Sequence, residues 1–244
     1  MTEGDRPKRD GLDDDIRDKL VVAGKSVVSI VPLAGGPLAE IVGAIVPGQR
    51  ADRIVTYLRA LDERVSKFEE AAKEALLNNP YKIDLVEEGG YQSARALSQN
   101  RVDQIVAAVT SGISASDADV TRRKRLLILL GELDDDEVNL LNAYGRSYGG
   151  ADRDAFEAVS RPGPIHMGSN REEIDQESLY VAGKEHLLRL GLLQKNYARP
   201  KQGQSVPEFD ARAGDFKHSV EISSLGRLLL REIGMPTPFD QQNT

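Results

Sequence analysis

The chain of 244 residues contains no cysteine and no tryptophan, and aromatic residues make up only 5% of it. Without cysteine there is no disulfide and no thiolate chemistry, and a zinc site would lack its commonest ligand. The scarcity of aromatic residues favours helices that pack through aliphatic side chains over a β-sandwich. The composition therefore predicts a mostly α-helical protein and is compatible with a reducing compartment.

Sequence motifs of catalysis are absent as well. No cluster of metal ligands, phosphate-binding loop or activated nucleophile occurs, and His166, His186 and His218 do not share the spacing of a metal site. The acidic residues 134–137 suit the first turn of a helix, where carboxylates oppose the positive end of the helix dipole. We expect a protein that is not an enzyme and has no cofactor, although an active site assembled from residues far apart in the chain would leave no motif.

Acidic residues outnumber basic ones, 39 to 32, which gives a formal net charge of −7. Such a chain has no overall positive field to attract nucleic acid or anionic lipid. Residues 1–19 hold seven acidic and five basic residues, and they lack the apolar core and cleavage site of a signal peptide. We expect a cytoplasmic protein, with a peripheral position at the inner membrane as a second option.

Residues 20–47, LVVAGKSVVSIVPLAGGPLAEIVGAIVP, form a long apolar stretch with only Lys25 and Glu40 as charges. Its central prolines and glycines predict two short helices of about 12 and 9 residues joined by a turn. At 1.5 Å per residue, neither arm would cross the roughly 30 Å core of a bilayer. A buried helical hairpin is the favoured interpretation, and a hairpin that opens to engage a membrane or a partner is the alternative. The residues that would make this contact are Val27, Ile30, Pro32, Gly35, Gly36, Pro37, Ile41 and Ile45.

Helical periodicity continues after this stretch. Spacings of four and three relate the apolar residues Ile54, Leu58, Leu61, Val65, Phe68 and Ala72. They predict a long helix with an apolar seam, which the Asn-Asn-Pro sequence at residues 78–80 would close. Residues 83–97 also have a helical pattern, but Gly89 and Gly90 predict an interruption there.

Two further helices are expected in the first half. Ser98 is a favourable N-cap for one of them, and Ser116 or Asp117 begins the other. We therefore predict an N-terminal helical bundle over residues 13–133, which includes the apolar hairpin. The charged residues 1–12 are expected to form a flexible tail.

The last third of the chain has a different order of elements. Two strand patterns are joined by a loop rich in proline, glycine, lysine and arginine, residues 198–217, here called the wing loop. Helical patterns precede and follow the strands, which is the order of a winged-helix domain. We predict such a domain, with a short β-hairpin, over residues 134–244. Its expected elements are helices at 134–144, 177–190 and 225–233 and strands at 193–197 and 219–222.

A winged helix suggests DNA binding, but the charges of this region argue against it. Residues 134–244 contain 13 basic and 18 acidic residues, whereas DNA-binding proteins draw much of their affinity from neutralised phosphates. On the expected recognition helix, Glu177 and Glu185 offset the available basic residues. A protein-interaction or structural use of the domain is therefore favoured. The candidate nucleic-acid contacts are Lys184, Arg189, Arg199, Lys201, Arg212 and Lys217.

One dense basic run, at residues 122–125, lies in the first half of the chain. It could contact phosphate or anionic lipid headgroups. A solvated helix face, neutralised by Asp117 and Asp119, is the favoured interpretation, because surface charge pairs of this kind are common and weak.

Three sequence phrases together carry a family resemblance. They are VPLAGGPLAEIVGAIVP at residues 31–47, LLILLGELDDDEVNLLNAY at residues 126–144, and LLRLGLL with ISSLGRLLLREIG at residues 187–193 and 222–234. In this combination the chain resembles poorly characterised bacterial proteins of the abortive-infection alpha type, which are associated with phage defence. The resemblance covers most of the chain and implies no catalytic residues. The long wing loop departs from the pattern.

Composition, pattern and resemblance lead to one functional hypothesis and one alternative. The hypothesis is a non-enzymatic interaction or effector protein of phage defence, whose apolar hairpin engages a membrane or a protein partner. The alternative is a winged-helix DNA-binding transcriptional regulator. A protein partner or self-association is expected, nucleic acid is disfavoured, and no small-molecule substrate is indicated.

Overall fold

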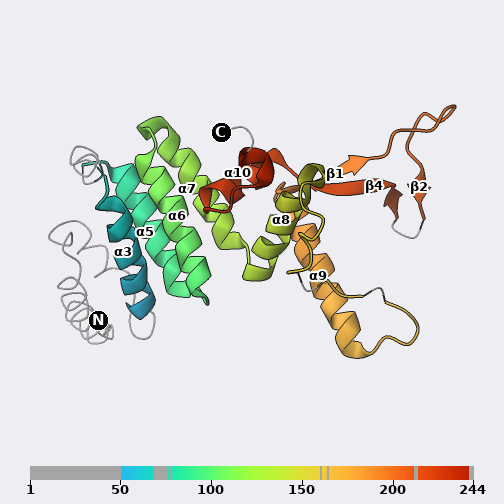
Figure 1. Cartoon of the computed structure of the whole chain (residues 1–244), viewed down its shortest axis with the longest axis horizontal. Coiled ribbons are helices and arrows are strands. Elements are labelled where there is room, and N and C mark those ends of the chain that lie inside the picture. Colours follow the sequence, from blue (N-terminus) through green and yellow to red (C-terminus); the bar gives the residue numbers. More distant parts are fainter. Residues whose placement is uncertain are drawn as a thin grey trace, which may run out of the picture. The chain divides into compact units, whose positions relative to one another are not determined.

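The computed structural model describes residues 51–68, 76, 78–159, 161–163, 165–211 and 214–241 (Figure 1). These residues are mostly helical and contain two small antiparallel sheets of two strands each. The predicted tail and the apolar hairpin, from Val27 to Ile45, lie outside the described residues. Among the helices that are described, none combines the length and the apolar character that a bilayer crossing would need.

The chain divides into two compact units, Met1–Ile128 and Leu129–Thr244. The division falls inside helix α7 (Asp117–Glu132), which contributes residues to both units. The sequence pattern placed the boundary after residue 133, where the acidic run begins. An unbroken helix shows no change of composition at its middle, so the pattern could mark only the end of the helix.

In the first unit, helices α3 (Ala51–Val65), α5 (Pro80–Arg95) and α6 (Gln99–Ser114) pack against one another. The apolar seam predicted on the first of these helices is buried at four positions: Ile54, Leu58, Leu61 and Val65. However, α3 ends at Val65 instead of continuing. Phe68 lies half-buried in the turn that follows, and Ala72 is outside the described residues.

Helix α5 runs without a break through Gly89 and Gly90, so the predicted interruption was wrong. Both glycines are buried, and a Cβ atom at Gly89 would lie 2.5 Å from Tyr57 Oη and 2.7 Å from Val109 Cγ2. The glycine therefore serves the close approach of α5 to α3 and α6 and not a turn. The Tyr57 hydroxyl donates a hydrogen bond of 3.0 Å to the Val86 carbonyl, and burial raises the pKa of this phenol.

The Asn-Asn-Pro sequence begins a helix and does not close one. Asn79 is the N-cap of α5, and its side-chain oxygen accepts hydrogen bonds from the backbone N–H groups of Tyr81 (3.0 Å) and Lys82 (3.3 Å). Pro80 occupies the first helical position, where its missing N–H is not needed. The predicted cap at Ser98 is confirmed, because its hydroxyl accepts a hydrogen bond of 3.1 Å from Arg101 N.

The second unit contains both sheets. Strand β1 pairs antiparallel with β4 in a register that sets Leu193 opposite Ile222, and both strand predictions are confirmed to within one residue. The wing loop contains a further small hairpin that the sequence pattern did not reveal. The elements are α8 (Asp135–Ser147), η2 (Tyr148–Gly150), α9 (Arg171–Arg189), β1 (Leu193–Tyr197), β2 (Phe209–Asp210), β3 (Asp215–Phe216), β4 (His218–Ile222), α10 (Ser224–Glu232) and α11 (Pro238–Gln241).

An aliphatic core holds the second unit together. Helix α8 contacts α9, α10 and β4. A Cβ atom at Gly145 of α8 would lie 2.7 Å from Leu230 Cδ1, so this glycine permits the approach of α10. The fully buried large side chains of this core are Leu130, Leu141, Leu187, Leu192, Leu193, Ile222, Leu229 and Leu230.

We expect Gly89→Ala to lower the free energy of unfolding by about 1–3 kcal/mol, because an added methyl group must displace the hydrogen-bonded Tyr57 ring or Val109. Urea denaturation of the full chain measures this loss. Gly131→Ala, at an exposed helical glycine, is the matched control and should leave stability unchanged or raise it by up to about 1 kcal/mol. Equal stability of the two variants would contradict the close approach at Gly89.

Candidate functional site

The joint between α8 and α9 is built around one carboxylate. Asp134 caps α8 by accepting a hydrogen bond from Glu137 N (2.7 Å), and Glu137 Oε2 accepts one from Asp134 N (3.0 Å). The other oxygen of Glu137 lies 2.6 Å from His186 Nδ1 of α9. Glu137 is only 8% exposed, so this contact satisfies a buried acceptor and holds the C-terminal half of α9 against α8.

Helix α9 is longer than predicted. Asn170 and Glu173 form a capping box, with hydrogen bonds of 2.9 and 3.0 Å between the side chain of each and the backbone N–H of the other. The helix therefore begins at Arg171 and not at Glu177. The sequence signal was present, because Asn-x-x-Glu is a capping pattern, but no apolar periodicity follows it.

Most of α9 is exposed to solvent. All of its 19 residues are described, and Leu187 is the one that is buried. Ile174 is 41% exposed, Val181 is 45% exposed and Leu179 is 74% exposed. Ile174 and Val181 are seven positions apart, so they share one side of the helix. Leu179 lies on the other side of the helix, because two residues are about 200° apart around its axis. The pair Ile174 and Val181 therefore forms the apolar face that is available for a partner.

The charge of α9 does not suit DNA. Its sequence contains five acidic and three basic residues. The two predicted nucleic-acid contacts on it are Lys184, which is half-buried, and Arg189, which is exposed. Glu185 lies beside Lys184 in the sequence, and it is exposed as well. A helix with this balance would repel a phosphate backbone along much of its length.

The wing loop neutralises its own lysines. Glu208 binds Lys201 Nζ and Lys217 Nζ, each at 2.7 Å. The hydrogen bonds from these two lysines lower the pKa of Glu208 to about 2. Lys195 on β1 is similarly bound to Asp215 Oδ2 at 2.8 Å, and this hydrogen bond lowers the pKa of Asp215. Two of the predicted phosphate contacts are thus already paired with a carboxylate.

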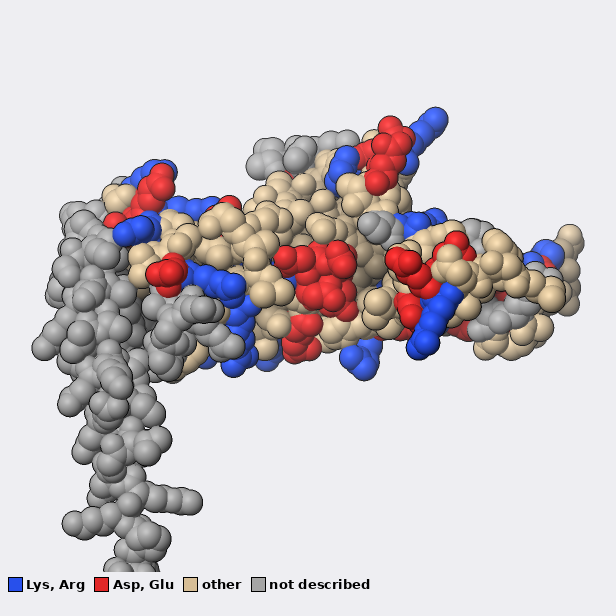
Figure 2. Space-filling model, turned by 90° about the horizontal axis from the view of Figure 1, so that it is seen from below, with Lys and Arg blue, Asp and Glu red and all other residues tan. Residues whose placement is uncertain are grey.

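The remaining wing residues leave little positive charge and some apolar surface. Arg199 is exposed, and Arg212 lies outside the described residues. Phe209 is 56% exposed and packs edge-to-face on Phe216, with ring centroids 5.6 Å apart. On the face drawn in Figure 2, acidic side chains gather in one patch of the described residues and also lie beside basic ones elsewhere.

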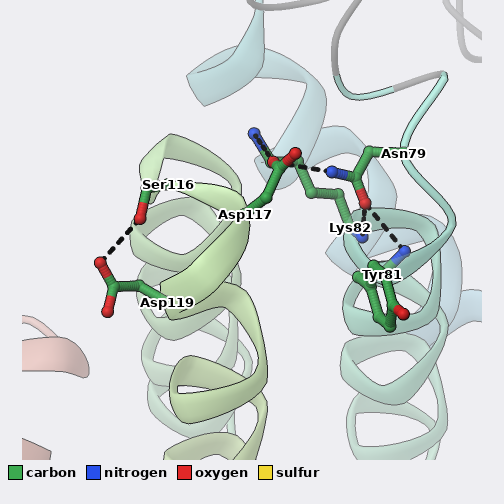
Figure 3. Close-up of polar contacts among 6 residues, drawn as sticks. All are labelled: Asn79, Tyr81, Lys82, Ser116, Asp117 and Asp119. Atoms are coloured by element: carbon green, nitrogen blue, oxygen red, sulfur yellow. Dashed lines mark hydrogen bonds and ion pairs between the residues drawn. The ribbon is translucent and has the colours of Figure 1, made fainter.

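The basic run on α7 is partly neutralised by nearby acids. Arg122 binds Asp119 at 2.8 Å, and Lys124 binds Asp84 of α5 at 2.5 Å. Figure 3 shows that Asp119 also accepts a hydrogen bond from Ser116, whereas Asp117 turns to Asn79 (2.7 Å). The run therefore belongs to a network of helix-start contacts and ion pairs, which agrees with the interpretation of a solvated face.

Sequence analysis did not identify the residues that decide the character of the second unit. Glu208 and Asp215 are isolated acids in a long loop, and only the hairpin β2–β3 brings them to the lysines. The exposed Ile174, Leu179 and Val181 lie before or near the start of the helix that was predicted. Within the described ranges, no group of three or more His, Asp or Glu residues is arranged to hold a metal ion.

Comparison of the chain with models of protein families, with curated proteins and with solved structures found no match.

A double-mutant cycle tests the joint between α8 and α9. Glu137→Ala and His186→Ala should each destabilise the second unit, and the cycle should give a coupling free energy of about 0.5–3 kcal/mol, because each variant removes the partner of the other. Urea denaturation of the full chain supplies the four stabilities. The exposed neighbour Asp136→Ala should change stability by no more than about 0.5 kcal/mol. Additive losses at Glu137 and His186 would show that the contact does not join the helices.

The ion pairs of Glu208 predict a pH dependence of the wing loop. A carboxyl whose pKa falls from 4.5 to about 2 on folding stabilises the folded loop above pH 4.5, and this contribution is lost as the pH falls toward 2. An NMR titration of the Glu208 carboxyl carbon should have its midpoint near pH 2. In the double variant Lys201→Ala, Lys217→Ala the midpoint should move toward 4.5. An unchanged midpoint in that variant would contradict the pairing.

Proposed function

We propose that the protein is a non-enzymatic interaction protein whose C-terminal unit binds another protein through the exposed face of α9. The single observation that carries this proposal is the exposure of Ile174 and Val181 on one side of a helix whose charged residues are mostly acidic. Water-exposed apolar side chains on a regular, well-capped helix are typical of a docking face. Acidic residues around them favour a partner with basic groups at the rim of the contact.

A winged-helix-like arrangement of the C-terminal unit is part of the proposal. The order α8, α9, β1, wing loop, β4 and α10 supports it, as does the antiparallel pairing of β1 with β4. In that arrangement α9 occupies the position of the recognition helix. Fold alone does not decide what such a helix binds, so the decision rests on its side chains.

The side chains favour a protein partner over DNA. Each phosphate contact requires a cation that is free to replace a counterion. Of the candidate contacts, Lys201 and Lys217 are bound to Glu208. Lys184, Arg189 and Arg199 form no ion pair within the described residues, and they are the strongest support for the alternative of a DNA-binding regulator. One half-buried lysine and two arginines, two of the three on the acidic helix α9, are a weak basis for duplex recognition.

The remaining parts of the proposal rest on the sequence. We propose that residues 13–133 form a helical bundle and that the apolar hairpin at residues 20–47 engages a membrane or a partner when the protein acts. A role in phage defence follows from the resemblance to the abortive-infection alpha type. A cytoplasmic location fits this role.

Site-specific photo-cross-linking in cells that express the full chain tests the docking face. A benzophenone amino acid at position 181 should give covalent adducts of defined mass with another protein. Ile174→Ser in the same chain should reduce the yield, because it removes an apolar side chain from the same side of α9. The control is the same amino acid at position 157, where the side chain is exposed. Equal adducts from both positions, or none from position 181, would contradict the proposal.

A further inference from the structure

A groove of about 760 Å³ follows strand β4 in the second unit. One wall is formed by four consecutive strand residues, 219–222, and the others include the aromatic side chains of Tyr144, Tyr148 and Phe239. No residue of β1 or α9 lines it. Consecutive strand residues point alternately to the two faces of a sheet, so a groove that touches all four lies at an edge of β4. Because no residue of β1 lines the groove, this is the edge that faces away from β1.

The hydrogen-bond pattern of the sheet identifies the backbone groups at this edge. Ala198 N donates to Lys217 O and Ser223 N donates to Leu192 O, each at 2.9 Å, at the two ends of the ladder. Bonded and non-bonded pairs alternate in an antiparallel ladder. The backbone groups of residues 219 and 221 therefore face β1, and those of Val220 face the groove.

The edge of β4 lacks the features that usually protect a free strand. In the part of the chain that the structure describes, β4 pairs with β1 alone, and no hydrogen bond reaches the backbone of Val220 from another segment. The sequence of β4, HSVEI, contains neither proline nor lysine. Exposed edges are ordinarily blocked by such residues, by a bulge or by a covering segment. An unblocked edge beside a groove can accept one more strand.

A cation lies beside two of the rings that line the groove. The guanidinium carbon of Arg227 is 4.7 Å from the centre of the Tyr148 ring and 4.8 Å from that of Phe239. Its Nη1 atom is buried and has no hydrogen-bond partner, and Nη2 donates only to Ser224 Oγ at 3.4 Å. No carboxylate of the described residues pairs with it. Arg227 is half-buried and does not itself line the groove, but its guanidinium adjoins two of the lining rings. A ligand that brings a carboxylate beside these rings would give the guanidinium a charged acceptor.

We propose that this groove binds an extended segment of a partner protein, which adds to β4 as a third strand. The backbone of the segment hydrogen-bonds to the N–H and C=O groups of Val220, and its apolar side chains contact Tyr144 and Tyr148. An Asp or Glu of the segment binds Arg227. The five residues of β4 span about 17 Å, so a segment of similar length is sufficient. The inference goes beyond the docking face on α9 and is independent of it.

Backbone pairing, aromatic walls and an unneutralised arginine favour this occupant over other classes. Backbone hydrogen bonds supply affinity for any extended peptide, and the pockets for alternate side chains supply specificity. A nucleic acid would bring phosphates, but the groove has one arginine beside it and the Glu221 carboxylate in its wall. A second copy of this chain would have to offer its own β4, and this is one outcome of the test.

The experiment selects seven-residue peptides from a random phage-displayed library on the full chain. The proposal predicts enrichment of peptides that alternate apolar and polar residues and contain Asp or Glu. A selected synthetic peptide should bind Val220→Ala as it binds the original chain. It should bind Val220→Pro about tenfold more weakly, because proline removes the N–H that faces the groove. Arg227→Gln should weaken the binding of acidic peptides by a similar factor, and Ile174→Ser should leave it unchanged.

Methylation of the peptide backbone keeps the test decisive even where the proline variant is unstable. Two versions of the peptide are compared, one with N-methyl groups on its odd-numbered residues and one with them on its even-numbered residues. One version should not bind and the other should bind almost normally, because a strand directs only every second N–H toward β4. Absence of enrichment, or equal binding of the two methylated versions, would overturn the proposal. Analytical sedimentation of the chain without peptide supplies one more test. A dimer that Val220→Pro dissociates would overturn the proposal, because a second copy of this chain would then occupy the groove.

Discussion

A buried carboxylate, that of Glu137, links the start of α8 to the end of α9, and much of the second unit depends on this link. Both oxygens are used, one for the cap of α8 and the other for His186. A buried charge must be partnered, so the contact determines which half of α9 packs against the unit. Leu187 lies in that half, whereas the half that begins at Arg171 contains no buried residue. The exposed apolar face of α9 is therefore a consequence of how the helix is attached.

The distribution of charge determines what such a unit can bind. The lysines of the wing loop suggest phosphate binding when only the sequence is considered. However, Glu208 binds both of them, and Asp215 binds Lys195 of the neighbouring strand β1. Exposed ion pairs of this kind contribute little to stability. Their effect is on recognition, because a cation already paired with a carboxylate gains less from a phosphate. The same unit presents apolar side chains on α9 and an open strand edge at β4, both of which are suited to protein ligands.

Local patterns in the sequence predicted the strands, the cap at Ser98, the acidic start of α8 and the first part of the seam on α3, because each depends on residues close together in the chain. The errors concern features with two physical explanations. Gly89 could break a helix or allow close packing, and only the positions of Tyr57 and Val109 decide between them. Asn79 and Pro80 could end one helix or begin the next. Carboxylate–lysine pairs in the wing loop, and the groove beside β4, arise from the tertiary arrangement and leave no local signal.

The central claim is that the C-terminal unit presents a protein-binding surface and not a DNA-binding one. Its most direct test is the salt dependence of binding between the full chain and a fluorescent 30-base-pair duplex of random sequence, measured by anisotropy. Three candidate contacts, Lys184, Arg189 and Arg199, are in no ion pair of the described residues, so the slope of log K against log salt concentration should be no steeper than about −3, at about −0.9 for each phosphate contact. A slope steeper than about −5, with tight binding at physiological salt, would contradict the account.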